Sequence, residues 1–210
     1  MTGGRSGEPA LNAVGDLVLT DPQAMDALAD PVWLSLLDEL RRHGPATIEE
    51  LAQRAGERPE IVCKCLAMME RVGLVERRAL ERSRGTTWAA IGKGFVFEIP
   101  EQPVGQAAAR ALSRTMIVHY ADLPRRWAVD DEPELELEWT RAAGLLNARL
   151  LVTPEELRDL QYELERVIAP FLTREPNEVP ADAAHVRLLS YFLPEAPLRS
   201  GERRGGRRET

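Results

Sequence analysis

The sequence lacks any run of 18 apolar residues, so it contains no segment suited to a transmembrane helix. Its first nine residues lack the apolar core of a secretory signal peptide. The two cysteines, Cys63 and Cys65, lie too close together in the chain to form an ordinary disulfide framework. These absences argue against membrane-spanning and disulfide-stapled secreted proteins, and they predict a cytoplasmic protein.

Motifs for catalysis are absent as well. The glycines form no phosphate-binding loop, and neither G-x-S-x-G nor H-E-x-x-H occurs. An acidic run covers residues 130–138, and its alternation with apolar residues from 134 onward is more typical of a solvated face than of a carboxylate cluster. We therefore expect neither an enzyme nor a bound cofactor.

The 210 residues are 44% hydrophobic and 29% charged, an ordinary mixture for one or two soluble globular domains. Their net charge of −7 argues against a nucleic-acid partner, because phosphate binding usually leaves a basic footprint. The charge is, however, unevenly distributed: residues 1–100 carry −3, residues 101–197 carry −7 and residues 198–210 carry +3. Residues 54–93 hold nine basic and five acidic side chains, a net +4, so a local face of this acidic chain can still meet phosphates.

Capping signals and apolar spacing predict four helices in the first half of the chain. Asp21-Pro22 and Asp30-Pro31 are typical helix starts, because Asp caps the helix and Pro suits its first position. Thr47 with Glu50 forms a capping box, and Gly56 supplies the turn to the next helix. The expected helices cover residues 23–28, 32–42, 47–55 and 58–72.

A hairpin is predicted directly after the fourth helix. Residues 74–80 and 86–91 have strand character, and the polar loop between them ends in glycine. Two helices joined by a tight glycine turn and followed by a basic hairpin are typical of a winged helix-turn-helix. We therefore assign residues 16–100 to such a domain and residues 1–15 to a disordered tail.

Two motifs carry a family resemblance. Residues 26–31, Asp-Ala-Leu-Ala-Asp-Pro, and residues 69–75, Met-Glu-Arg-Val-Gly-Leu-Val, resemble the opening and the wing entry of ArsR-like (arsenic-repressor-type) bacterial transcription regulators. The resemblance covers about residues 16–97. It implies a bacterial regulator that binds a pseudo-palindromic operator as a homodimer, paired through helices flanking the wing domain. Glu57 and Glu60 depart from the family, which favours Ser, Thr, Gln and Arg there.

The fourth helix is the candidate recognition helix, because such helices direct their N-terminal exposed side chains toward base edges in the major groove. Arginines of the hairpin are candidates for phosphate contacts, since guanidinium groups bind phosphate bidentately. The predicted DNA-binding residues are Thr47, Arg58, Glu60, Cys63, Lys64, Arg77, Arg78, Arg82, Ser83 and Arg84.

Some members of the resembled family sense metals through a Cys-x-Cys element on the helix before the recognition helix. Here the pair falls within the recognition helix itself. Residues i and i+2 of a helix point about 200° apart, so Cys63 and Cys65 cannot easily share one ion. We predict no metal site, an exposed Cys63 and a partly buried Cys65; a redox role for Cys63 stays open.

The sequence of the second half of the chain predicts a mixture of helices and strands. Expected are a long helix over residues 102–127, a helix from the capping box at Thr153 to about residue 172, and strands at 134–139, 145–152 and 186–193. The predicted fold class is mainly α (α+β): an N-terminal winged helix-turn-helix, a long linking and dimerisation helix, and a small C-terminal α+β region. The last two occupy residues 101–196, and a basic disordered tail covers 197–210.

Residues of the second half are also candidates for an effector pocket, because ligand sites are mostly apolar with a few polar groups. Those named are Met116, His119, Tyr120 and Trp139, with core packing and a dimer interface as the alternative. The expected partners are double-stranded DNA, a second copy of the chain and a small effector, without a membrane. A second hypothesis is a protein-interaction module on a winged-helix scaffold that no longer binds DNA, which the acidic totals and Glu60 favour.

Overall fold

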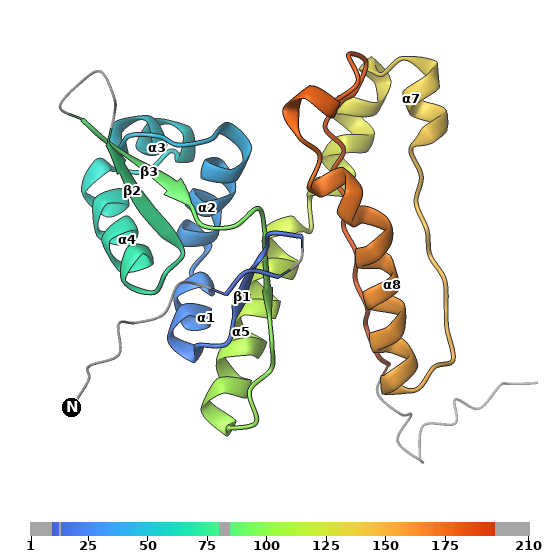
Figure 1. Ribbon diagram of the computed structural model, residues 1–210, viewed down its shortest axis with the longest axis horizontal. Coiled ribbons are helices and arrows are strands. Elements are labelled where there is room, and N and C mark those ends of the chain that lie inside the picture. Colours follow the sequence, from blue (N-terminus) through green and yellow to red (C-terminus); the bar gives the residue numbers. More distant parts are fainter. Residues whose placement is uncertain (1–9, 13, 80–84, 196–210) are drawn as a thin grey trace, which may run out of the picture. The chain divides into compact units, whose positions relative to one another are not determined.

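The computed structural model describes residues 10–12, 14–79 and 85–195 of the chain, which divides into two units, residues 1–174 and residues 175–210 (Figure 1). Among the described residues, no helix is long and apolar enough to cross a membrane. The first unit contains β1 Leu17–Leu19, α1 Pro22–Leu28, α2 Pro31–His43, α3 Ile48–Ala55, α4 Pro59–Arg71, β2 Val75–Ala79, β3 Thr86–Ala90, β4 Phe95–Phe97, α5 Pro103–Tyr120, α6 Leu123–Arg126, α7 Leu137–Ala142 and α8 Pro154–Leu172.

Helices α1 to α4 surround one apolar core, and the β2–β3 hairpin lies beside α4 (Figure 1). Leu37 of α2, Leu51 of α3 and Leu66 of α4 are fully buried within it. Ala46 adds a one-residue third strand, because its N–H donates to the Trp88 carbonyl at 3.0 Å and its carbonyl accepts from the Trp88 N–H at 2.8 Å. Three-helix packing against a small antiparallel sheet confirms the predicted winged helix-turn-helix fold.

The capping signals form as predicted. The Asp21 carboxylate accepts from the Gln23 N–H at 3.0 Å, and the Asp30 carboxylate accepts from the Val32 N–H at 2.8 Å. Gly56 ends α3 in the left-handed region, at φ 67°, which lets the chain turn sharply into α4. These local contacts explain why the starts and ends of the first four helices match the sequence prediction closely.

A parallel pair of short strands was not predicted. β1 pairs with β4, so that Leu17 lies opposite Phe95. The Val18 N–H also donates to the Ala10 carbonyl at 2.8 Å, and Val14 is buried. The prediction of a disordered tail over residues 1–15 is therefore wrong for its described end, residues 10–12, 14 and 15, whereas residues 1–9 lie outside the described part.

The long helix expected over residues 102–127 is confirmed for its first two thirds. α5 ends at Tyr120, and the chain continues through α6 and a π-helix at Trp127–Asp131. α5 packs against α1, burying Ala108 and Leu112. Its Thr115 hydroxyl donates to the Ala29 carbonyl at 2.8 Å, which anchors α5 to the winged helix-turn-helix domain.

The prediction of strands in the C-terminal region is wrong. Glu134 ends a 3-10 turn and residues 137–139 begin α7, while residues 145–152 and 186–193 form no strand with any described segment. Alternation of apolar and polar residues favours a strand only where a partner strand supplies hydrogen bonds, and none pairs with these segments. The capping box at Thr153 and helix α8 are confirmed. The tail predicted for residues 197–210 lies outside the described residues.

The α3 capping box predicts a pH-dependent contribution to stability. Hydrogen bonds from the Thr47 backbone and hydroxyl lower the pKa of Glu50 from its ordinary value of 4.5. Because the folded pKa is depressed, this stabilisation is present above pH 4.5 and is lost as the pH falls through the folded pKa. Glu50→Gln should lower the melting temperature at pH 7, and the difference from wild type should vanish on acidification. Glu49→Gln, which removes a neighbouring carboxylate without a capping bond, is the control for thermal unfolding scans between pH 7 and pH 3.

Candidate nucleic-acid interface

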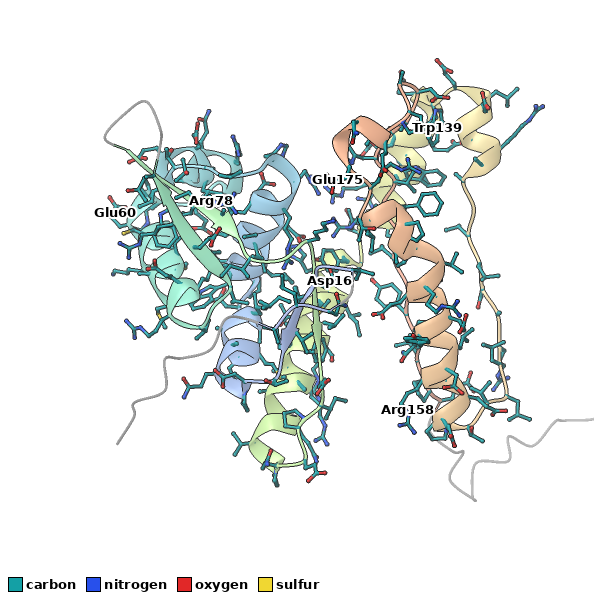
Figure 2. All side chains as sticks on the ribbon, in the orientation of Figure 1. Asp16, Glu60, Arg78, Trp139, Arg158 and Glu175 are labelled. Carbon is teal, nitrogen blue, oxygen red and sulfur yellow. The ribbon has the colours of Figure 1, made fainter. Side chains whose placement is uncertain are left out.

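Helix α4 separates its side chains cleanly into a buried face and an exposed face. Val62, Leu66 and Met69 are fully buried against the core. Predicted contact residues occupy the other side, where Glu60 projects from the outer surface of α4 (Figure 2). The four predicted residues Arg58, Glu60, Cys63 and Lys64 are all exposed and fall within the first two turns of the helix or at its N-cap.

Two further exposed positions, which were not among the predicted contact residues, extend this surface. Met68 and Arg71 follow Lys64 by four and seven residues, so they share its side of α4. Arg54, in the last turn of α3, is exposed as well. The helical spacing from Glu60 onward was the available signal for Met68 and Arg71. We define the recognition surface as the exposed residues Arg54, Arg58, Glu60, Cys63, Lys64, Met68 and Arg71.

Thr47 lies at the N-cap of α3, where its polar groups are already engaged. Its N–H donates to Glu50 Oε2 at 2.8 Å, and its Oγ1 accepts from the Glu50 N–H at 3.3 Å. The structure thus gives Thr47 a capping role, and a DNA contact by this residue stays a prediction.

Arg77 and Arg78 lie on opposite faces of the hairpin, because neighbouring strand residues point to opposite sides. Arg78 pairs with Glu76 of its own strand, with Nη2 2.7 Å from Oε1 (Figure 2 labels Arg78). Arg77 instead donates to Glu70 of α4 at 2.7 Å and lies over the Trp88 ring. The remaining predicted wing residues, Arg82, Ser83 and Arg84, lie outside the described residues.

Cys63 and Cys65 have different environments, as predicted. Both thiols are free; Cys63 is exposed and Cys65 is buried. Desolvation is the largest influence that raises the pKa of the Cys65 thiol above its ordinary value of 9.0. Among the described residues, no group of three or more His, Cys, Asp or Glu side chains is placed to hold a metal ion.

This difference predicts two labelling rates. At pH 8 in the folded protein, a thiol-specific reagent should modify Cys63 quickly and Cys65 slowly, because thiolate is the reactive species and Cys65 is both desolvated and shielded. Mass spectrometry of tryptic peptides would measure each rate, with denatured protein as the control in which the two rates approach each other. Equal rates in the folded state would contradict the burial of Cys65.

The four effector-pocket candidates do not come together as one cavity lining. Met116 packs against the apolar core, and His119 Nε2 lies 3.3 Å from Asp38 Oδ2. The Tyr120 hydroxyl donates to Asp38 Oδ1 at 3.0 Å, so these α5 residues hold α5 against α2. Trp139 belongs to α7. An open groove of about 270 Å³ contains none of the four; Leu40, Arg41, Pro45, Arg78, Ala89, Ala90, Gly92 and Lys93 line it. An effector site at the four residues stays a prediction.

Comparison with known proteins yields matches among solved structures alone: no family model and no curated protein matches the sequence. The YusO protein from Bacillus subtilis is 15% identical, covering 70% of this chain and 82% of that one, with a TM-score of 0.31. NMB1585, a MarR family regulator from Neisseria meningitidis, is 16% identical, with coverages of 67% and 79% and a TM-score of 0.30. A MarR family transcriptional regulator from Silicibacter pomeroyi is 15% identical, with coverages of 74% and 75% and a TM-score of 0.27.

The winged helix-turn-helix fold of this chain is shown by its own helix packing and β2–β3 hairpin. The ArsR-like resemblance remains a prediction.

Proposed function

We propose that this protein is a DNA-binding transcription regulator whose α4 enters the major groove while the β2–β3 wing contacts the flanking backbone. The observation that carries the proposal is the recognition surface of α4. Its Arg58, Lys64 and Arg71 are exposed on one helix, and the opposite side of that helix is fully buried. The major groove admits a helix presented in this way.

Local charge supports the same proposal. Residues 54–93 carry +4 within a chain of −7, and most of this excess, +3, falls on residues 75–93 of the wing. Screening limits the influence of distant acidic residues to about 10 Å at moderate salt. DNA is thus confined to one face of the protein, and non-specific binding is weak.

The assembly we propose is a homodimer in a bacterial cytoplasm, bound to a pseudo-palindromic operator. A two-fold dimer presents two α4 helices to half-sites about one helical turn apart. α5 is the helix we assign to the dimer interface, since Val104 and Val118 on it are 72% and 76% exposed. A small effector is part of the proposal, with Met116, His119 and Tyr120 of α5 as one set of candidate contacts and Trp139 of α7 as a separate one; binding at α5 would alter its docking against α2.

The test is DNA binding at two salt concentrations. Fluorescence anisotropy with a fragment from upstream of the protein's own gene should show a dissociation constant that rises steeply between 50 and 200 mM salt. Each phosphate contact contributes about −0.9 to the slope of log affinity against log salt. An unrelated fragment of equal length is the control for specificity. Absence of salt-sensitive binding to every upstream fragment would overturn the proposal.

A second candidate is the protein-interaction module without DNA binding. Glu60 favours it, because this exposed carboxylate lies in the first turn of α4, where DNA phosphates would repel it. Glu60→Gln separates the two candidates. For a DNA-binding protein that uses α4 near phosphates, Glu60→Gln strengthens non-specific DNA binding, whereas for the interaction module neither form of the protein binds DNA.

A further inference from the structure

Arg77 occupies the junction between the wing and the recognition helix. It lies opposite Trp88 in the β2–β3 pairing, on the face of the hairpin that meets the core. Its Cζ lies 4.9 Å from the centroid of the Trp88 ring, and its Nη2 donates to Glu70 Oε2 at 2.7 Å. Glu70 is the penultimate residue of α4, so one guanidinium connects β2, β3 and α4.

The surroundings hold this guanidinium in a defined orientation. The Trp88 side chain is 5% exposed, and the backbone of Trp88 is held by two hydrogen bonds to the backbone of Ala46. A guanidinium that lies over an aromatic ring and also donates to a carboxylate has little rotational freedom left. Arg78, one residue further along β2, differs because its carboxylate partner, Glu76, belongs to the same strand. The Arg78 pair therefore restrains nothing between elements.

We infer that Arg77 is a positioning residue that sets the angle between the wing and α4, rather than a phosphate ligand. The inference rests on the proposed DNA-binding function. Its side chain is 56% exposed, so solvent screening keeps the ion pair's contribution to stability small, and its importance is geometric.

A small change in the position of Arg77 affects DNA binding because Arg77 lies at the base of the wing. Hydrogen bonds to phosphate need donor–acceptor distances of about 2.7–3.2 Å, so a change in the angle between β2 and α4 should weaken contacts made by the wing.

Glu70 distinguishes this role from direct phosphate binding. If Arg77 leaves Glu70 in order to bind a DNA phosphate, the Glu70 carboxylate competes with that phosphate. Neutralising Glu70 then strengthens DNA binding. If Arg77 instead positions the wing, the Glu70 carboxylate helps to hold the Arg77 side chain in place. Neutralising Glu70 then weakens DNA binding. The two roles therefore predict opposite signs for one nearly isosteric substitution, Glu70→Gln.

The experiment measures operator affinity and salt slope for wild type, E70Q, R77A, the double variant and R77K. We expect E70Q and R77A each to weaken binding about 3–10-fold, with the double variant no weaker than R77A, because contacting residues are coupled. The salt slope should stay at the wild-type value in all of them. R77K, which keeps the charge but not the planar geometry, should resemble R77A.

R78A is the matched control on the opposite face of β2, and its salt slope should fall by about 0.9. Circular dichroism and thermal unfolding establish that each variant is folded; if R77A unfolds, E70Q and R77K decide the question. Tighter binding by E70Q, or a salt slope reduced by about 0.9 in R77A, overturns the inference while leaving the proposed function intact. Absence of DNA binding by wild type instead overturns the proposed function, and the positioning role with it.

Discussion

The double variant R58A/K64A is expected to bind operator DNA about 100-fold more weakly than wild type. Arg58 and Lys64 are exposed near the N-terminus of α4, where a recognition helix meets the groove. A hydrogen bond to a charged group contributes about 1.5 kcal/mol or more, so losing two costs about 3 kcal/mol, or about two powers of ten. Titrations at several salt concentrations should also show a slope smaller by about 1.8, if both side chains bind phosphate.

A matched control for that experiment is R141A/R158A. It removes the same charge from two exposed arginines outside the winged helix-turn-helix domain, one on α7 and one on α8. Its affinity should remain within about twofold of wild type, because these charges are screened from the groove. Equal losses in the two double variants would show that net charge, and not the recognition surface, governs binding.

Leu66→Ala is expected to lower the free energy of unfolding by about 2–5 kcal/mol. Leu66 lies in the middle of α4 with no exposed surface, inside the core shared by α2, α3 and the wing. Its truncation removes buried apolar area and leaves a cavity. Since the free energy of unfolding of small domains is only about 5–15 kcal/mol, this single substitution removes a large part of the stability.

Met68→Ala is the control for Leu66→Ala, because it truncates a side chain of similar size on the same helix that is 50% exposed. Surface substitutions usually change stability by about 0.5 kcal/mol or less. Urea unfolding followed by tryptophan fluorescence should give a much lower midpoint for Leu66→Ala and nearly the wild-type midpoint for Met68→Ala. Similar midpoints for both would contradict the assigned orientation of α4.

Signals that act within a few residues were sufficient to predict the winged helix-turn-helix domain. Asp21, Asp30 and Thr47 cap helices through hydrogen bonds to residues two or three positions away, and Gly56 turns the chain by its own conformation. The exposed side of α4 followed from helical spacing in the same way, which is why Arg58, Glu60, Cys63 and Lys64 were placed correctly on the surface.

Signals that depend on distant partners misled the prediction. β1 and β4 are three-residue strands about 78 residues apart, too short to show periodicity and paired only after folding. Residues 134–139 alternate like a strand, yet the chain there passes from a 3-10 turn into α7, since no described strand pairs with it. A strand needs a partner for its backbone hydrogen bonds, whereas a helix supplies its own.

By itself, then, the sequence determined the helix-turn-helix, the hairpin and the local basic charge, since each depends on neighbouring residues. Only the tertiary structure decided what Arg77 does. As one of several wing arginines it was expected to bind phosphate, but folding brings Glu70 and Trp88 against it. Strand pairing and helix packing create that environment, and neither is encoded in the residues adjacent to Arg77 in the chain.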